Sequence, residues 1–345
     1  MKNRRVVISQ VGDPEVLQMV EEELPEPGAG EVRVKVLATG VAFADIAIRQ
    51  GKYPDPTAPK VPFTPGYDIF GTVDEVGPGV SSLAVGQSVA AMLPKFGGNA
   101  EYVNLPEELL VPAPEGLDPA EAVSVVLNYL TAHRLLHESA KVEEGERILV
   151  HGAAGGVGTA LLQLGKLAGL EMYGTASKGK HELVSNLGAT PIDYRNEDFV
   201  ERIGALTDDG VDAAFDWIGG SNLIRSYDTL RKGGRLINYG FAGAMKGGMK
   251  VVLSSFARLF WYKLVPDGKT AQMYGGTPGL ATKKNTWYRE TLTELLNLLA
   301  EGKITPVIGA RIPLSEASRA HELMEKSAVE GKVVLINAHA AKGAY

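Results

Sequence analysis

The sequence contains no cysteine among its 345 residues. This absence excludes disulfide bonds, thiolate catalysis, iron–sulfur clusters and any zinc site with cysteine ligands. An excess of positive charge is also missing, since 35 Lys and Arg stand against 41 Asp and Glu, for a formal net charge of −6. With no dominant basic stretch, the chain is not expected to bind nucleic acid.

Long hydrophobic runs are absent as well. The N-terminus offers only residues 6–8, which are too few for the apolar core of a signal peptide. The longest apolar region, 251–265, contains Arg258 and Lys263 and is too short and too charged to span a bilayer. We therefore expect no transmembrane segment and a cytoplasmic location. Two interpretations of 251–265 stay open: a helix packed on the protein or a partner, or an amphipathic helix at a membrane interface.

Glycine is abundant, with 41 residues, and the chain is long enough for roughly two domains. Residues 1–111 are typical of short strands separated by turns rich in proline and glycine, and 31–36 alternates polar and apolar side chains. Asp118, followed by Pro119 and Glu121, predicts a helix N-terminus, and this helix extends to about His137. Strands and helices then alternate, beginning with a strand at 147–151 and a helix at 158–168. This alternation predicts an α/β fold in which a β-barrel precedes a doubly wound parallel sheet.

A glycine-rich loop follows the strand predicted at 147–151 and opens the next helix. The pyrophosphate of a dinucleotide binds at such a place, because glycines let the backbone approach it and the helix N-terminus supplies free N–H groups. The loop reads A-x-x-G-x-G from Ala153 to Gly158 instead of G-x-G-x-x-G. The alternative is a plain glycine-rich turn. The predicted contacts are Ala154, Gly155, Gly156 and Val157.

The next predicted strand, 171–176, is followed by Ser177, near the place where an NAD site usually has an acidic residue to hold the ribose 2′-hydroxyl. Here the chain has Ser177, Lys178 and Lys180 instead. A carboxylate would repel a 2′-phosphate, whereas a hydroxyl and two ammonium groups would bind it. These residues favour NADPH over NADH as the cofactor; the alternative is a pair of solvated lysines at a helix start.

With these motifs, the chain resembles the medium-chain dehydrogenase/reductase superfamily, and within it the zinc-free quinone oxidoreductase branch. The resemblance implies a GroES-like domain at 1–122, completed by about 305–345, and a Rossmann domain at 123–304. It also implies a homodimer and a cap or dimer region at about 241–284. The segments that carry it, besides the glycine loop, are Gly40-Val41-Ala42-Phe43-Ala44-Asp45 with Arg49-Gln50-Gly51-Lys52-Tyr53-Pro54, Pro65-Gly66-Tyr67-Asp68-Ile69-Phe70-Gly71-Thr72-Val73, Leu187-Gly188-Ala189 and Gly331-Lys332-Val333-Val334-Leu335.

The zinc branches of that superfamily place a cysteine where Ala42 stands and His-Glu where Tyr67-Asp68 stands. We therefore expect no metal. One departure from the zinc-free branch is Ala42 itself, because that branch usually has an asparagine there near the nicotinamide.

The resemblance assigns further cofactor contacts by position. Tyr129 and Thr131 would face the nicotinamide, Tyr194 would flank the adenosine phosphate, and Gly240 and Phe241 would line the nicotinamide ribose. The alternatives are a helix hydroxyl for Thr131, a packing residue for Tyr194 and a plain turn at Gly240-Phe241.

The implied activity is hydride transfer from NADPH to a small electron-poor substrate, a quinone or an α,β-unsaturated carbonyl. Tyr53 is the candidate proton donor, because related enoyl-thioester reductases carry a tyrosine at that motif position. Phe43 and Tyr67 are predicted to line the substrate pocket; the alternative for all three is a wall or core residue. The competing functions are an enoyl-thioester reductase, or an NADPH-binding scaffold or sensor, in one version membrane-associated, with little catalysis.

Overall fold

The computed structural model describes residues 2–54 and 58–338. Contacts divide the chain into two units, one from Met1–Leu130 with Thr277–Tyr345 and the other from Thr131–Gly276. The contacts group 277–304 with the first unit, and the predicted domain boundary near 304 stays a prediction.

The first unit is built on a seven-stranded sheet in the order β14-β15-β3-β4-β5-β7, with β6 paired to β3. Its C-terminal strand β15 runs antiparallel to β3, from Val333 opposite Val41 to Ile336 opposite Ala38. The end of the chain therefore returns to the N-terminal sheet, as the resemblance implies. The strands of this sheet are β3 (Glu31–Val41), β4 (Asp68–Val76), β5 (Ser88–Met92), β6 (Tyr102–Pro106), β7 (Val111–Pro112), β14 (Ile308–Pro313) and β15 (Lys332–Ile336). Strands β1 (Lys2–Ile8) and β2 (Leu17–Glu23) form a separate two-stranded antiparallel sheet.

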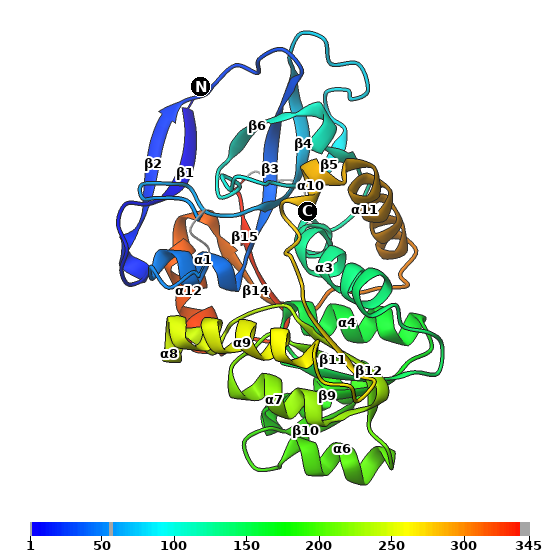
Figure 1. The fold of residues 1–345 in the computed structure, drawn as a ribbon. Coiled ribbons are helices and arrows are strands. Elements are labelled where there is room, and N and C mark those ends of the chain that lie inside the picture. Colours follow the sequence, from blue (N-terminus) through cyan, green and yellow to red (C-terminus); the bar gives the residue numbers. More distant parts are fainter. Residues whose placement is uncertain (1, 55–57, 339–345) are drawn as a thin grey trace. The chain divides into compact units, whose positions relative to one another are not determined.

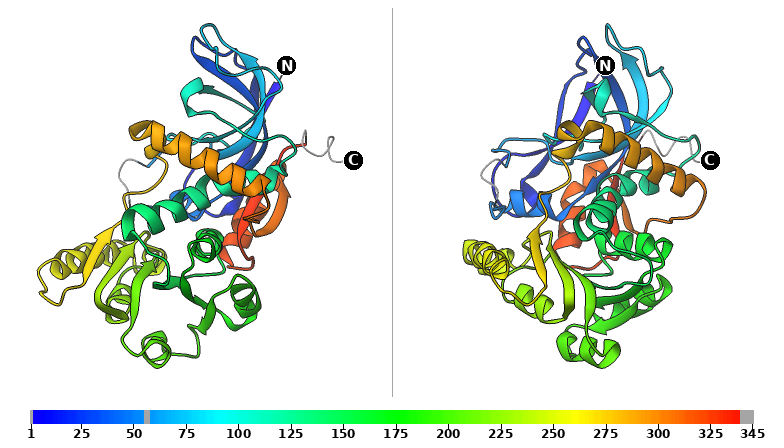
Figure 2. Two further views of the ribbon diagram at one scale, coloured as in Figure 1. Left: turned by 90° about the vertical axis from the view of Figure 1, so that its right-hand side faces the viewer. Right: turned by 45° about the vertical axis from the view of Figure 1, so that its right-hand side comes forward.

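The helix predicted to start after Asp118 begins there, because the Asp118 carboxylate accepts the backbone N–H groups of Ala120 and Glu121. It is not one regular α-helix, since Val125–Tyr129 and Arg134–Ala140 are π-helical. Helix α11 packs along its first half (Figure 2). The helices of the first unit are α1 (Phe43–Arg49), α2 (Pro119–Ser124), α10 (Leu280–Lys283), α11 (Asn285–Ala300) and α12 (Ala317–Glu325).

The second unit is a six-stranded, wholly parallel sheet in the order β10-β9-β8-β11-β12-β13 (Figure 1). Its first strand, β8, lies between β9 and β11, so the strand order reverses there, which is where doubly wound sheets bind ligands. The strands are β8 (Arg147–His151), β9 (Glu171–Ala176), β10 (Thr190–Asp193), β11 (Val211–Asp216), β12 (Leu230–Asn238) and β13 (Thr270–Met273). The helices are α3 (Leu130–His133, across the division between the units), α4 (Gly156–Leu167), α5 (His181–Asn186), α6 (Phe199–Thr207), α7 (Ser221–Asp228), α8 (Ala244–Gly247) and α9 (Met249–Tyr262).

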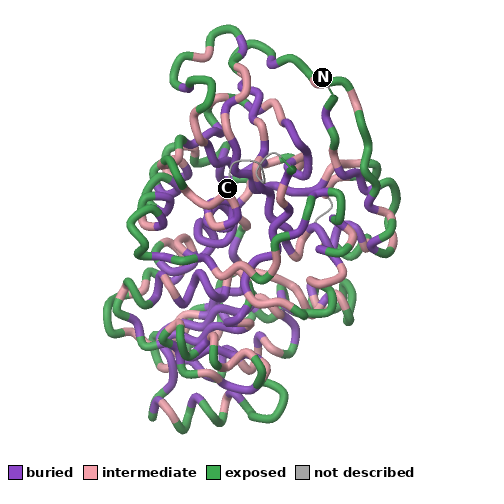
Figure 3. The backbone as a smooth tube through the Cα atoms, turned by 180° about the vertical axis from the view of Figure 1, so that it is seen from behind, coloured by how far each residue is buried: buried purple, intermediate pink, exposed green. Residues whose placement is uncertain are grey.

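The core of this unit includes a layer between the sheet and helices α6, α7 and α9. Sheet residues such as Leu149 and Leu236 are fully buried there, and the rings of Tyr227 and Tyr262 stack 3.7 Å apart between α7 and α9. Figure 3 shows buried strands inside and helices whose outer turns are exposed. The predicted fold class, a GroES-like domain with a Rossmann sheet, is confirmed.

Part of the segment 241–284 belongs to this sheet. Strand β13 pairs in parallel with β12, from Thr270 opposite Arg235 to Met273 opposite Asn238. The sequence gives little sign of this strand, because it is only four residues long and lies at a sheet edge. No helix among residues 2–54 and 58–338 is long and apolar enough to cross a membrane.

Candidate functional site

The carboxyl ends of the parallel strands form one edge of the second unit. The register places Asp193 opposite Ala176, Thr175 opposite His151, and Asp216 opposite Asn238. The loops that follow these strands therefore begin side by side. They carry the predicted cofactor residues Tyr194, Ser177, Lys178, Lys180, Ala154, Gly155, Gly156, Val157, Gly240 and Phe241.

The glycine loop is shaped as a cradle for a phosphate group. Gly152 has φ of 66°, and a Cβ there would lie 2.5 Å from Nε1 of Trp217. A Cβ at Gly158 would lie 2.3 Å from the backbone oxygen of Gly152, so helix and loop approach as closely as only glycine allows. The N-cap of α4 is Gly155, and no side chain caps the helix there. The free N–H groups of the first turn fit an anionic pyrophosphate.

A chain of buried hydrogen bonds lies directly behind this loop. The Gly152 N–H donates to Oγ1 of Thr175 at 3.2 Å, and Thr175 Oγ1 lies 3.1 Å from Nδ1 of His151. Nε2 of His151 lies 2.9 Å from Oγ of Ser226, which donates to Oδ2 of Asp216 at 2.8 Å. Because Asp216 only accepts, one proton arrangement satisfies the whole series, with Thr175 donating to Nδ1 and Nε2–H donating to Ser226.

This network connects two loops of the site. The other oxygen of Asp216 accepts the backbone N–H groups of Ile218 and Gly219, in the turn after β11. Burial lowers the pKa of His151, which keeps the imidazole neutral in this role. Sequence analysis missed these residues, because they come from three strands and a helix and match no local motif.

The loop after β9 presents the predicted 2′-phosphate residues. Ser177 is half-buried directly after the strand, and its carbonyl accepts the N–H of Lys180 at 2.8 Å. The carboxylate of Asp193, at the end of the neighbouring strand β10, accepts hydrogen bonds from the Asn196 side chain and the Arg195 backbone. These hydrogen bonds lower the pKa of Asp193 and hold its carboxylate within its own turn.

Tyr194 follows β10 and is 53% exposed. The guanidinium of Arg195 lies 5.7 Å from the centre of its ring. Arg195 is a further cation at this corner that sequence analysis missed; its position directly after Tyr194 was the available signal.

Tyr129 and Thr131 lie on either side of the division between the units. Tyr129 is buried, its hydroxyl has no hydrogen-bond partner among the described residues, and burial raises its pKa far above the ordinary value. An orphaned buried hydroxyl of this kind fits a group that binds a ligand. Thr131 is buried in α3.

The predicted substrate residues lie in the first unit. Tyr67 is buried edge-to-face against Phe96, with ring centres 5.1 Å apart, and Phe96 packs similarly on Phe63. Burial raises the pKa of Tyr67 well above its ordinary value, and nearby Asp45, Asp68 and Tyr53 raise it further. Tyr53 is therefore a neighbour of Tyr67, although it is 38% exposed. Phe43, at the start of α1, is half-buried.

A buried charged cluster lies beside Tyr67. The Asp45 carboxylate accepts the N–H groups of Ala42 at 2.9 Å and Gly66 at 3.2 Å. Burial raises the pKa of Asp45 to about 7. Asp68 Oδ2 forms an ion pair with Nζ of Lys332 at 2.7 Å, and both side chains are almost fully buried.

The ammonium of Lys332 thus faces the carboxylate that stands at a zinc-branch position. Gly40 makes room for the pair, because a Cβ there would lie 2.3 Å from Cε of Lys332. Within 2–54 and 58–338, no group of three or more His, Cys, Asp and Glu residues is placed to hold a metal ion.

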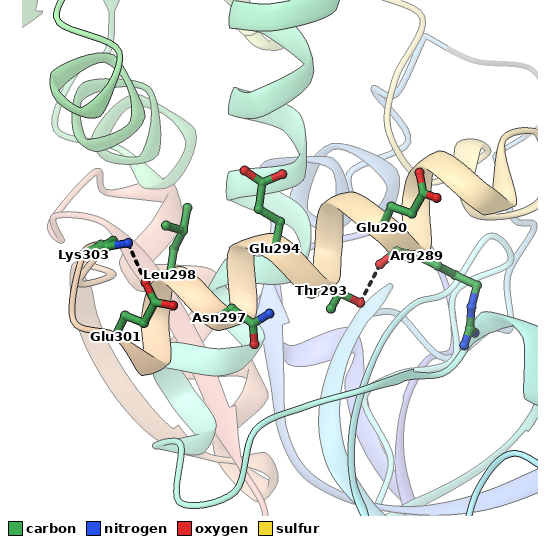
Figure 4. Close-up of a pocket in the computed structure, with 8 residues that line it drawn as sticks. All are labelled: Arg289, Glu290, Thr293, Glu294, Asn297, Leu298, Glu301 and Lys303. Atoms are coloured by element: carbon green, nitrogen blue, oxygen red, sulfur yellow. Dashed lines mark hydrogen bonds and ion pairs between the residues drawn. The ribbon is translucent and has the colours of Figure 1, made fainter.

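A shallow groove along α11 contains none of the predicted site residues (Figure 4). Its sides are charged, and Glu301 pairs with Lys303 at 2.6 Å across one end. We therefore assign it no part in the site. The lining residues are Arg289, Glu290, Thr293, Glu294, Asn297, Leu298, Glu301 and Lys303.

The fold and the glycine loop define a dehydrogenase or reductase with a dinucleotide site. Two family models agree: the alcohol dehydrogenase GroES-like domain matches residues 28–115, and the zinc-binding dehydrogenase matches 187–335. The synaptic vesicle membrane protein VAT-1 homolog of Rattus norvegicus is 34% identical over 319 residues, covering 90% of this chain and 78% of that protein.

The quinone oxidoreductase of the same organism is 30% identical over 339 residues, covering 96% of this chain and 97% of that protein. Among solved structures, the quinone oxidoreductase of Escherichia coli complexed with NADPH superimposes with a TM-score of 0.86 at 29% identity, covering 96% of this chain and 99% of that one. The chain belongs to the medium-chain dehydrogenase/reductase superfamily, in the family that includes quinone oxidoreductases and VAT-1 homologues.

Proposed function

We propose that this protein is an NADPH-dependent, zinc-independent oxidoreductase that reduces quinones or α,β-unsaturated carbonyl compounds. The observation that carries the proposal is the carboxyl edge of the Rossmann sheet. There an uncapped helix N-terminus and a glycine cradle adjoin Ser177, Lys178 and Lys180, with no acidic residue directly after β9. The NADPH bound to the similar Escherichia coli structure supports the same cofactor here.

The residues divide the cofactor between them. The loop Ala154–Val157 and the first turn of α4 hold the pyrophosphate through backbone N–H groups. Ser177, Lys178 and Lys180 bind the 2′-phosphate, and Tyr194 with Arg195 covers the adenosine side. The remaining cofactor residues serve the nicotinamide half, and they are Tyr129, Thr131, Gly240 and Phe241.

Bound NADPH supplies a hydride, and the protein supplies position and protons. Reduction of an enone or quinone leaves negative charge on an oxygen, which needs a hydrogen-bond donor. Tyr53, which is partly exposed, donates the proton. Tyr67, whose raised pKa keeps its phenol protonated, donates a hydrogen bond, and Phe43 lines the substrate pocket with it.

The activity test follows NADPH oxidation with a panel of quinones, enones and an enoyl-thioester, with NADH alongside. We expect turnover on quinones or enones, faster with NADPH, and unchanged after treatment with EDTA. Turnover only on the enoyl-thioester would show that the protein is an enoyl-thioester reductase instead of a quinone or enone reductase. Tight NADPH binding without turnover on any acceptor would contradict the enzymatic function.

Tyr53→Phe tests the proton donor. General acid catalysis typically contributes roughly 10²–10⁴-fold, so we expect kcat to fall by about that factor while the Kd for NADPH stays constant. Tyr102→Phe, in β6, is the matched control. An unchanged kcat in Tyr53→Phe would exclude this role.

We also propose that the protein is a homodimer. Sedimentation should then report a species of twice the 36.7 kDa chain mass. A species of one chain mass at all concentrations would contradict it.

A further inference from the structure

Helix α9 has two apolar faces, of which the fold uses one. Its buried face, formed by Val252, Ser255, Leu259 and Tyr262, packs on the Rossmann unit. Five of its other apolar side chains are more than half exposed, which is uncommon for large hydrophobic residues gathered on one short helix, and Val251 is half-buried. They are Met249, Leu253, Phe256, Phe260 and Trp261, continued by Leu264 just beyond the helix.

Most of these exposed side chains form one stripe. The positions 249, 253, 256, 260 and 264 recur every three or four residues, so they lie along one side of the helix. Trp261 adds an indole beside the stripe. We call this surface the α9 stripe, comprising these five positions and Trp261.

The charge around the α9 stripe has a single sign. Segment 244–266 contains four basic residues and no acidic residue, although the whole chain has a net charge of −6. All four basic side chains are exposed. Asp228 and Asp267 raise the pKa of Tyr262, which lies on the buried face of the helix. The four basic residues are Lys246, Lys250, Arg258 and Lys263.

The combination of exposed apolar side chains with exposed basic residues favours one kind of partner. A second copy of the same helix would bring two sets of four cations together, and like charges oppose that contact. A helix with exposed Phe, Trp and Leu between basic residues fits an anionic lipid surface, where the rings enter the headgroup region and the cations meet phosphates.

We propose that α9 docks this protein on anionic phospholipid membranes, lying in the interface with the α9 stripe inserted. The docking is peripheral and reversible, since the helix is 14 residues long and cannot span a bilayer. It is argued separately from the proposed reductase activity. Phe256 packs on the proposed cofactor residue Phe241, with ring centres 5.8 Å apart, so the test variants leave Phe256 in place.

The experiment measures co-sedimentation of the full-length protein with phosphatidylcholine vesicles, with and without phosphatidylserine. We expect binding only when phosphatidylserine is present, weakening as salt is added. Trp261 fluorescence should shift to the blue with those vesicles, and a Trp261→Phe variant should lose the shift.

Two sets of variants separate the apolar and the charged contributions. Leu253→Ser with Phe260→Ser should lower vesicle partitioning by at least about tenfold, since each removes a large apolar group from the membrane. Lys250→Gln and Arg258→Gln should each lower it about fivefold, which is about 1 kcal/mol per cation.

The controls are an exposed leucine and an exposed lysine elsewhere, Leu167→Ser and Lys303→Gln, which should leave partitioning unchanged. NADPH binding by all variants should equal that of the wild type, which shows that they are folded. Absence of vesicle binding at low salt would overturn the proposal. So would a Leu253→Ser/Phe260→Ser protein that turns from dimer to monomer with unchanged partitioning, because the α9 stripe would then be an interface between copies.

Discussion

The two units place their functional groups in different ways. In the Rossmann unit, the cofactor residues follow directly after consecutive strands, and the parallel register brings them to one edge. In the GroES-like unit, the groups beside Tyr67 come from distant parts of the chain, and Asp68 meets Lys332 across 264 positions. The residues of the first arrangement lie in short sequence motifs directly after strands. The second arrangement forms only when the C-terminal strand has joined the sheet.

The two units also differ in how much free energy their functional groups cost the fold. At the sheet edge, backbone N–H groups are left open for a ligand, which costs little because water reaches them. Beside Tyr67, charges are buried and must satisfy one another, so removing one partner leaves an isolated charge in a low-dielectric interior. Variants should therefore destabilise the fold most in the GroES-like unit and affect cofactor binding most in the Rossmann unit.

The largest effect is expected from breaking the buried ion pair. Lys332→Met leaves Asp68 buried and unpaired, and should lower the unfolding free energy by about 3–5 kcal/mol in urea titrations. Asp68→Leu with Lys332→Met should recover most of that loss. Arg311→Met, which removes an exposed ion pair with Asp118, should change stability by less than about 1 kcal/mol. A loss this small in Lys332→Met would contradict the description of the pair.

The second effect is a pH dependence. The raised pKa of Asp45, about 7 against 3.8, means that the folded state binds a proton that the unfolded state has released. Stability should therefore fall as pH rises from about 4 to about 7 and then level off. One pKa unit corresponds to about 1.4 kcal/mol. The unfolding free energy of the wild type, relative to that of Asp45→Asn, should therefore decline by up to about 4 kcal/mol over this pH range.

The measurement is urea unfolding of both proteins across this pH range. Asp228→Asn, at an exposed position, is the control and should differ from wild type by a constant amount. A wild-type advantage over Asp45→Asn that grows with pH would reverse the sign and refute the assignment.

The third effect sharpens the contrast at the glycine loop. Gly158→Ala forces a Cβ against the backbone of Gly152 and Ala153, so we expect a loss of about 1–3 kcal/mol in stability. The Kd for NADPH should rise by about tenfold or more, since each about 1.4 kcal/mol of lost binding is a factor of ten. Gly204→Ala in α6 has open space around it and should stabilise the helix by about 0.5–1 kcal/mol. Equal behaviour of the two variants would argue against the cradle.

The smallest effect concerns the network behind the loop. Ser226→Ala removes the link between His151 and Asp216 and should cost about 1–2 kcal/mol in stability. Because the network supports both loops, the Kd for NADPH should rise while kcat at saturating NADPH stays near the wild-type value. Thr159→Ala, which removes a hydroxyl bonded to the Gly156 carbonyl in α4, is a comparison for a local bond. A loss of stability with an unchanged Kd for NADPH would show that the network has only a structural role.

The sequence was informative where structure is local. The strands 147–151 and 171–176 and the glycine loop carry their signals within a few residues, and the structure places them as predicted. β13 escaped prediction because four edge residues show no pattern, and the π-helical turns in 125–140 leave no mark in composition. The pairs Asp68–Lys332 and Ser226–His151 could not be predicted because they depend on tertiary register.

The Kd values for NADPH and NADH, in wild type and in a Ser177→Ala/Lys178→Ala/Lys180→Ala variant, test the central claim most directly. Hydrogen bonds to charged groups contribute about 1.5–3 kcal/mol each. The wild type should therefore prefer NADPH, and the variant should bind it at least about tenfold more weakly. The Kd of the variant for NADH should change by less than roughly twofold. Lys166→Ala, on α4, is the control and should change neither the Kd for NADPH nor the Kd for NADH. Equal weakening for both dinucleotides, or a wild-type preference for NADH, would contradict the claim that this edge of the sheet recognises the 2′-phosphate.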